Sequence, residues 1–133
     1  MADKKPQYKI LITDDDKFLL DMYSIKFTEN NFEVSVANSG EDALDKVEDG
    51  LRPDVYLVDL LMPKLDGFQL INKLREKGIG KEAAIVILSN LGQKEDIDKG
   101  LKLGVDGYIV KASATPSEVV NKTIDIVKTK LKH

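Results

Sequence analysis

The chain has 133 residues, and 42% of them are hydrophobic, which is the size and apolar content of one domain with its own buried core. It has no cysteine and its single histidine is His133, so disulfides, thiolate or histidine-rich metal sites, cysteine nucleophiles and a Ser-His-Asp triad are excluded. A net charge of −3, from 20 basic and 23 acidic residues, argues against a basic nucleic-acid footprint.

The chain starts with the polar stretch MADKKPQ, which lacks the apolar core of a signal peptide. No apolar run approaches the roughly 20 residues that a membrane span needs. We therefore expect a cytoplasmic protein, with a polar N-terminal lead over residues 1–7 and one folded domain over residues 8–131.

Short β-rich runs alternate along the chain with longer segments of helical spacing. These runs are Tyr8–Thr13, Phe32–Ala37, Val55–Val58, Ala83–Leu88 and Gly107–Val110. Three of them are almost continuously apolar, as is typical of strands that are buried on both faces. The alternation predicts a (βα)5 domain of the α/β class, in which helices cover both faces of a parallel five-stranded sheet.

Capping and turn residues mark two of the predicted helices. Ser39 followed by Asp42 resembles a capping box at the start of the second helix. Asp66 and Gly67 form a turn before the third helix, which is expected to stop at Gly78.

The last two predicted helices differ in strength. The segment Gln93–Leu103 is the weakest, because Gly100 inside it costs about 1 kcal/mol relative to alanine. The final helix has Pro116 in its first turn and a candidate cap at Thr115 or Ser117. Its apolar positions are Val120, Ile124, Val127 and Leu131. No linker follows this helix, which favours a single-domain protein.

Polar side chains stand where the predicted strands end. They are Asp14, Asp15 and Asp16 after the first strand, Asp59 after the third, Ser89 and Asn90 after the fourth, and Lys111 after the fifth. Ligands of open parallel sheets bind at the carboxyl ends of the strands. We therefore expect carboxylates, a hydroxyl and an ammonium group to share one crevice.

The charges in this crevice favour a metal-dependent phosphoryl acceptor. Asp14, Asp15 and Asp59 together with Lys111 carry a net charge of −2, which one divalent cation would balance. Mg²⁺ favours one or two carboxylates together with waters and a phosphate. Without the metal, crowding of like charges should raise the pKa of at least one carboxylate. A carboxylate beside Mg²⁺ and lysine can attack phosphorus and form an aspartyl phosphate, with Ser89 as a hydrogen-bond donor to it.

Four stretches, in this order, resemble the receiver domain of two-component response regulators: ILITDDD, YLVDLLMPKLDG, IVILSN and GYIVK. The resemblance covers about residues 8–131 and implies a flavodoxin-like sheet with strand order 2-1-3-4-5. It also implies that Asp59 is the phosphoacceptor. Mg²⁺ would be held by Asp15, Asp59 and the backbone carbonyl of Leu61, with Asp14 reaching it through water.

The same resemblance implies a signalling switch rather than an enzyme. A sensor histidine kinase or a histidine phosphotransfer protein would phosphorylate Asp59, and the phosphoryl group would draw in Ser89 and Lys111. Tyr108, the aromatic switch residue, would then turn inward. The surface of the fourth helix, fifth strand and fifth helix would change, contact a downstream protein target and could mediate a homodimer. We expect no direct nucleic-acid or membrane partner.

Two other functions stay open at this point. A haloacid-dehalogenase-like phosphatase would use Asp14 as the nucleophile and Asp16 as the acid/base, although Asp16 fits better as the N-cap of the first helix. The chain is also short for that class. A degenerate receiver would bind partners without phosphate, and the complete acidic site argues against this function.

The sequence departs from the receiver pattern after Lys111, where Ala112 replaces the usual proline and its cis peptide bond. A cis bond before a non-proline residue costs roughly 2.5–4 kcal/mol, so we expect a trans bond or an adjusted loop. Two leucines, Leu61 and Leu91, flank the acceptor at places that influence phosphoryl lifetime in the family. We hypothesise that they hinder the attacking water and slow self-dephosphorylation.

Overall fold

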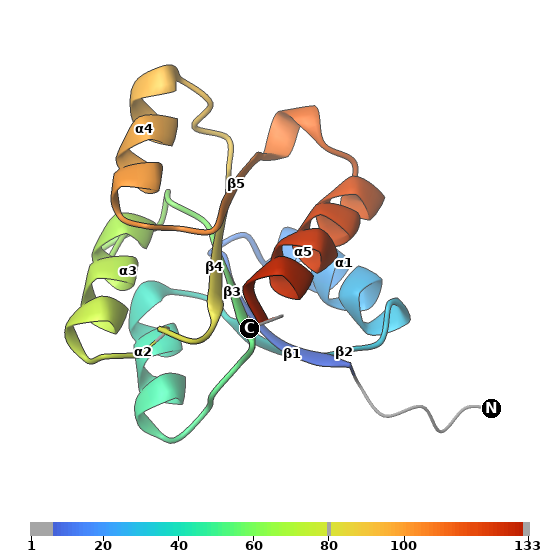
Figure 1. Cartoon of the computed structure of the whole chain (residues 1–133), viewed down its shortest axis with the longest axis horizontal. Coiled ribbons are helices and arrows are strands. Elements are labelled where there is room, and N and C mark those ends of the chain that lie inside the picture. Colours follow the sequence, from blue (N-terminus) through green and yellow to red (C-terminus); the bar gives the residue numbers. More distant parts are fainter. Residues whose placement is uncertain (1–6, 80, 132–133) are drawn as a thin grey trace.

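A parallel five-stranded sheet organises the chain, with strand order β2-β1-β3-β4-β5 (Figure 1). The computed structural model describes residues 7–79 and 81–131, so residues 1–6 of the predicted polar lead and His133 lie outside it. The strands are β1 (Tyr8–Thr13), β2 (Phe32–Ala37), β3 (Val55–Val58), β4 (Ala84–Ser89) and β5 (Gly107–Val110). The predicted (βα)5 flavodoxin-like fold and its strand order are confirmed.

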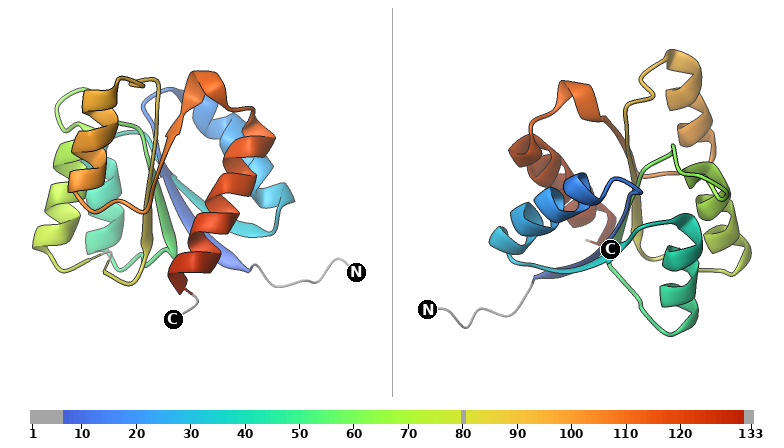
Figure 2. Two further views of the ribbon diagram at one scale, coloured as in Figure 1. Left: turned by 45° about the horizontal axis from the view of Figure 1, so that its top comes forward. Right: turned by 180° about the vertical axis from the view of Figure 1, so that it is seen from behind.

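Helices cover both faces of this sheet. They are α1 (Lys17–Glu29), α2 (Gly40–Glu48), α3 (Gly67–Glu76), α4 (Lys94–Lys102) and α5 (Pro116–Leu131), with a short 3₁₀ helix, η1 (Lys111–Ser113), before α5. Figure 2 shows α1 and α5 on one face and α2, α3 and α4 on the other. Within the described ranges, no helix has both the length and the apolar character that crossing a membrane would require.

The core consists of two apolar layers, one on each face of the sheet. The residues of β3 and β4 are buried throughout, which explains why their sequences are continuously apolar rather than alternating. The layer beneath α1 and α5 includes Leu20, Tyr23, Phe27, Val120 and Val127. The layer beneath α2 and α3 includes Ala43, Val47, Leu70, Ile71 and Leu74.

The fourth strand differs from its prediction by one residue at each end. It runs over Ala84–Ser89 instead of Ala83–Leu88, because Ala84 pairs with Val55 of β3 while Ser89 still pairs with Val110 of β5. Ser89 is therefore the last residue of the strand rather than the first residue of the loop. A polar side chain at the end of a strand does not interrupt the backbone pairing, so hydropathy alone places the end of this strand one residue too early.

Capping interactions fix where several helices begin. Asp66 and Gln69 form the reciprocal bonds of a capping box at α3. Thr115, one of the two candidate caps of α5, forms an equivalent pair of bonds with Glu118. These bonds satisfy backbone N–H groups that the first turn of a helix leaves without partners.

The capping box predicted at α2 is only half correct. Ser39 accepts a hydrogen bond from the Asp42 N–H, as expected, but the Asp42 carboxylate accepts from the Asn38 N–H instead of from Ser39. The returning bond is thus displaced by one residue, because the Asp42 side chain is one methylene shorter than the glutamate that usually completes such a box.

Two helices meet the rest of the domain in contrasting ways. At the start of α3, a Cβ on Gly67 would lie 2.4 Å from the carbonyl oxygen of Asp59, so only glycine allows this close approach. In α4, by contrast, Gly100 is the only buried residue, and the N-cap Gln93 makes no side-chain capping bond. The residue range predicted as the weakest helix is therefore also loosely anchored.

Candidate functional site

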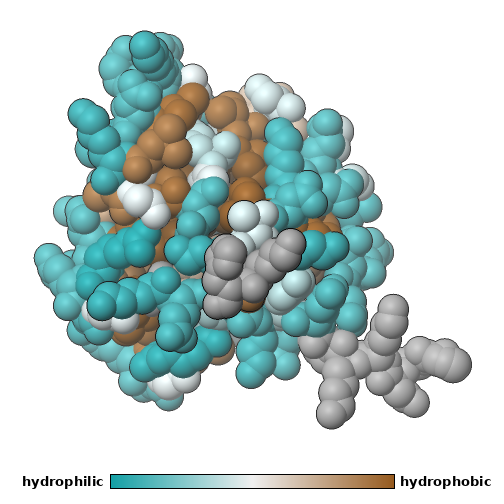
Figure 3. Space-filling model, viewed as in Figure 1, coloured by the Kyte–Doolittle hydropathy of each residue, from teal (hydrophilic) through white to brown (hydrophobic). Residues whose placement is uncertain are grey.

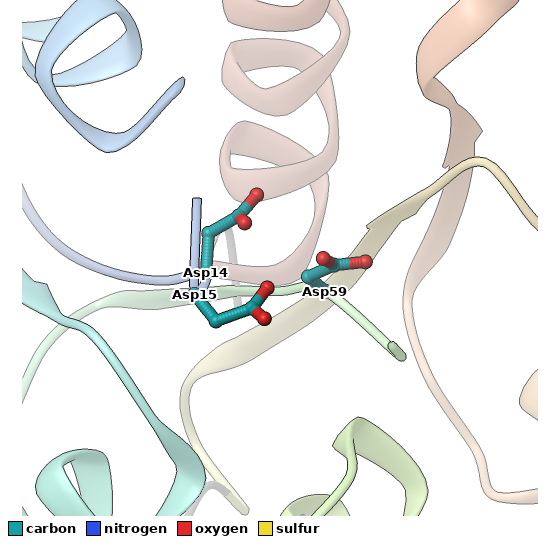
Figure 4. Close-up of side chains that lie close together, drawn as sticks. All are labelled: Asp14, Asp15 and Asp59. Carbon is teal, nitrogen blue, oxygen red and sulfur yellow. The ribbon is translucent and has the colours of Figure 1, made fainter. Parts of the chain in front are cut away.

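Three carboxylates lie side by side at the carboxyl edge of the sheet (Figure 4). Asp14 and Asp15 follow β1, and Asp59 follows β3; these strands are neighbours whose last residues, Thr13 and Val58, are paired. One oxygen from each carboxylate lies within 4.8 Å of the others. Asp14 and Asp59 are buried, whereas Asp15 is exposed and open to solvent. The parallel register thus brings together the acidic residues that the sequence placed at strand ends.

Lys111 completes this cluster from the end of β5. Its Nζ atom lies 2.7 Å from Asp14 Oδ2 and 3.3 Å from Asp59 Oδ2, so one ammonium bridges both buried carboxylates. The predicted convergence of three carboxylates and one ammonium is therefore present. The Lys111–Ala112 peptide is trans, as expected, and the chain continues through the 3₁₀ helix η1.

Burial and charge set the protonation of the bridged pair. The pKa of Asp59 is raised, chiefly by burial and further by the negative charge of Asp14, while Lys111 opposes this rise. Burial lowers the pKa of Lys111, but its hydrogen bonds and charge interactions with Asp14 and Asp59 outweigh this effect and raise it. The expectation of a raised carboxylate pKa is correct for Asp59. Its main cause is burial rather than the expected crowding.

The donor set fits a hard divalent cation. Carboxylate oxygens are the ligands that Mg²⁺ prefers, and three of them converge here with only one positive side chain between them. Asp15 is exposed and leaves the cluster reachable from solvent. At Leu61, the described contact is its N–H, which donates to Asp59 Oδ1 at 3.4 Å. The Leu61 carbonyl therefore stays a predicted ligand.

Ser89 and Tyr108 both contact the loop between β4 and α4. The buried Ser89 Oγ accepts a hydrogen bond from the Leu91 N–H at 3.3 Å. The Tyr108 hydroxyl donates a hydrogen bond to the carbonyl oxygen of Leu91. Their roles as switch residues remain predictions, but both side chains act on the same loop residue.

Asp16 stands apart from the carboxylate cluster. It is the N-cap of α1, where its Oδ1 accepts from the Leu19 N–H at 3.2 Å. Its own N–H donates to Asp14 Oδ1 at 2.9 Å. The predicted capping role is confirmed, and Asp59 rather than Asp16 joins Asp14 and Asp15 in the cluster.

Two exposed apolar side chains on α1 were missed by the sequence reasoning. Phe18 and Ile25 of α1 are 76% and 60% exposed, seven residues apart on one side of the helix. The opposite side buries Leu20, Tyr23 and Phe27 in the core. The signal was available, because apolar residues occur around the whole circumference of α1 although one stripe would satisfy the core.

Known proteins share both the sequence pattern and the fold. Residues 10–123 match the sequence model of the response regulator receiver domain. The chain is 38% identical over 116 residues to the chemotaxis protein CheY of Treponema pallidum, which covers 83% of this chain and 78% of that protein. The receiver domain of the Francisella response regulator 1452 superposes with a TM-score of 0.83 at 33% identity, covering 92% of this chain and 98% of that domain.

A longer relative shows the same match over part of its length. The alkaline phosphatase synthesis transcriptional regulatory protein PhoP of Bacillus subtilis is 34% identical over 113 residues, which are 84% of this chain but 45% of PhoP. The chain therefore spans less than half of PhoP. It belongs to the response regulator receiver domain family, whose members are signalling switches of two-component systems and bind Mg²⁺ at an acidic pocket.

The raised pKa of Asp59 makes the stability of the protein depend on pH. Ionising Asp59 in the folded state costs free energy and so lowers the stability of the fold. This cost is absent below the ordinary pKa of 3.8, where the carboxyl is protonated in both states. It grows as pH rises and is complete above the folded-state pKa. In metal-free buffer at pH 7, we expect Asp59→Asn to raise Tm by about 4 °C, the shift that 1 kcal/mol gives in a domain of this size. Thermal unfolding measured from pH 4 to 8 should show the gain shrinking towards pH 4.

Asp45→Asn, which changes an exposed aspartate on α2, is the matched control and should leave Tm unchanged. An Asp59→Asn gain that is absent at pH 7, or that is the same at every pH, would contradict the electrostatic description of the site.

Proposed function

We propose that this chain is a phosphorylation-dependent switch that accepts a phosphoryl group on Asp59 in a Mg²⁺-dependent reaction. The observation that carries this proposal is the convergence of Asp14, Asp15, Asp59 and Lys111 at one sheet edge. A buried carboxylate with a neighbouring cation and further acidic groups is suited to forming an acyl phosphate.

Among the three carboxylates, Asp59 is the best nucleophile. Both oxygens of Asp14 accept short bonds, one from Lys111 at 2.7 Å and one from the Asp16 N–H at 2.9 Å. The bonds to Asp59 are longer, 3.3 Å from Lys111 and 3.4 Å from the Leu61 N–H. Asp59 is therefore shielded from water, and its carboxylate is held by longer hydrogen bonds than that of Asp14. Its raised pKa makes it the more basic carboxylate and the better nucleophile.

Each remaining residue of the cluster has a distinct role. Asp15 and Asp59, with the Leu61 carbonyl and with Asp14 through water, would hold Mg²⁺, which supplies positive charge to the transferring phosphoryl group. Lys111, whose Nζ atom contacts Asp14 and Asp59, would neutralise charge on the same group. An oxygen of Asp59 bonds to phosphorus while the bond from phosphorus to the donor histidine breaks, and the electron pair returns to the imidazole.

The response is carried by the loosely anchored α4. Ser89 would turn its hydroxyl towards the phosphoryl group and pull the adjacent loop, and Tyr108 would turn inward. Figure 3 shows hydrophobic surface gathered between α4 and α5, and Leu101 of α4 is 53% exposed. This α4–β5–α5 face is the proposed contact for a downstream protein target or for a second copy of the chain, since such exposed patches mark interaction sites.

The phosphodonor would dock on α1. This helix begins directly after Asp14, Asp15 and Asp16, and its exposed Phe18 and Ile25 form an apolar strip along one side of it. A protein donor, either a sensor histidine kinase or a histidine phosphotransfer protein, can use this strip to place its phosphohistidine. A small donor such as acetyl phosphate has no need of it.

The chemical proposal is tested by incubating the protein with Mg²⁺ and acetyl phosphate and then measuring its intact mass. We expect one added phosphoryl group, which is absent in Asp59→Asn and absent without a divalent cation. The reason is that the label requires the Asp59 oxygen and the charge of the metal.

Two other outcomes would contradict the proposal and support a different function. Turnover of a phosphomonoester that is lost in Asp14→Asn but retained in Asp59→Asn would indicate the phosphatase chemistry. A complete lack of metal-dependent labelling would indicate a receiver that binds partners without phosphate.

The docking surface is tested by comparing two donors. In Phe18→Ser and Ile25→Ser, transfer from the histidine kinase that phosphorylates this chain should fall about tenfold, the effect of losing an interface anchor of about 1.4 kcal/mol. Labelling by acetyl phosphate should not change. Leu101→Ser, at an exposed apolar side chain on α4, is the matched control and should leave both rates unchanged. An equal loss with both donors would instead mean damage to the site, and no loss with the kinase would exclude α1 as the docking helix.

The lifetime of the phosphoryl group should depend on Leu61 and Leu91. Both side chains line one groove with the segment that directly follows Asp59 in the chain. We propose that water approaches phosphorus through this groove. We expect Leu61→Ala and Leu91→Ala each to shorten the half-life of the phosphorylated protein by about two- to tenfold, which corresponds to roughly 0.4–1.4 kcal/mol in the barrier. Decay followed by intact mass after removal of acetyl phosphate measures this change. An unchanged or longer half-life would show that the leucines do not hinder water.

A further inference from the structure

Leu91 is held on both sides of its backbone. Its N–H donates to Ser89 Oγ at 3.3 Å, and its carbonyl oxygen accepts a hydrogen bond from the Tyr108 hydroxyl. The first bond joins it to the last residue of β4, while the second comes from Tyr108 of β5, which is 17 residues further along the chain. The Tyr108 hydroxyl is thus a tertiary anchor for a loop residue.

The place of Leu91 matters because of what its side chain lines. It lines a groove together with the segment that directly follows Asp59 in the chain. The groove residues of that segment are Leu60, Leu61, Met62 and Pro63. Leu61 is 54% exposed and so does not close this groove by itself, and Leu91 lines the same groove.

Gly100 explains how Tyr108 reaches this loop. A Cβ at position 100 would lie 2.8 Å from Ile87 Cδ1 and 3.1 Å from the Tyr108 ring, so a larger residue there would push against this ring. Glycine inside a helix costs about 0.5–1 kcal/mol relative to alanine. The glycine that weakens α4 therefore also makes room for the Tyr108 ring.

We infer that Tyr108 is a positioning residue that prolongs the lifetime of the phosphoryl group, because its hydroxyl holds Leu91 over the groove through the Leu91 carbonyl. This inference rests on the proposed phosphorylation of Asp59. In the hydrolysis step, the oxygen of water bonds to phosphorus, and the bond between phosphorus and the Asp59 oxygen breaks. Its electron pair returns to the carboxylate, and the protons pass to the released phosphate and to solvent. Tyr108 touches none of these atoms; it restricts where water can enter.

The test compares the phosphoryl half-life in Tyr108→Phe, Leu91→Ala and the double variant, each labelled with acetyl phosphate and Mg²⁺ and followed by intact mass. Tyr108→Phe keeps the ring on Gly100 and removes only the hydroxyl. We expect it to shorten the half-life about two- to tenfold, the range given by one lost hydrogen bond. In the Leu91→Ala background the same change should have no further effect, because the side chain that it positions is already gone.

Two further variants separate positioning from general destabilisation. Tyr8→Phe removes a hydroxyl from the first residue of β1, at the end of the strand opposite to the carboxylate cluster, and should leave the half-life unchanged. Gly100→Ala should shorten the half-life as Tyr108→Phe does, because its methyl group displaces the ring.

An unchanged half-life in Tyr108→Phe, or an effect that adds fully to that of Leu91→Ala, would overturn the inference while leaving Asp59 as the acceptor. A wild-type protein that takes no label would overturn the proposed function and this inference together.

Discussion

The bridge from the Lys111 ammonium to Asp14 and Asp59 is the interaction on which the site depends. Two buried carboxylates repel each other, and removing them from water is costly unless a charge compensates them. Lys111 provides only part of that compensation, since the pKa of Asp59 stays raised. The incomplete balance keeps the cluster short of positive charge. A divalent cation can supply that charge.

The elements that carry the residues of this site are packed to different degrees. Asp14 and Asp59 follow the paired, fully buried ends of β1 and β3, and Gly67 lets α3 start against the Asp59 backbone. The carboxylates are therefore fixed by core packing. Ser89, in contrast, leads into a loop and into α4, which buries a single residue. Because weakly packed elements rearrange at low free-energy cost, α4 can move more readily than the carboxylate cluster.

The sequence was sufficient for the architecture and for the convergence of acidic groups, since both follow from local patterns and one topological rule. Apolar runs defined the strands, and parallel pairing then required their polar successors to meet. Features that depend on side-chain placement were not predictable in this way. Burial, which dominates the pKa of Asp59, and the bond from Tyr108 to Leu91 both arise from tertiary packing. The exposure of Phe18 was missed for another reason: the apolar residues around the whole circumference of α1 signalled it, but an apolar residue in a helix is ordinarily assigned to the core.

The central claim is that the three carboxylates form one cation site next to the phosphoryl acceptor. Crystals grown or soaked with Mn²⁺, which takes similar oxygen ligands and gives an anomalous signal, test it directly. We expect one strong anomalous peak at the carboxyl edge of the sheet, with Asp15 and Asp59 as direct ligands, and its loss in Asp15→Asn. The absence of a peak at saturating Mn²⁺, or a peak bound away from Asp59, would contradict the claim.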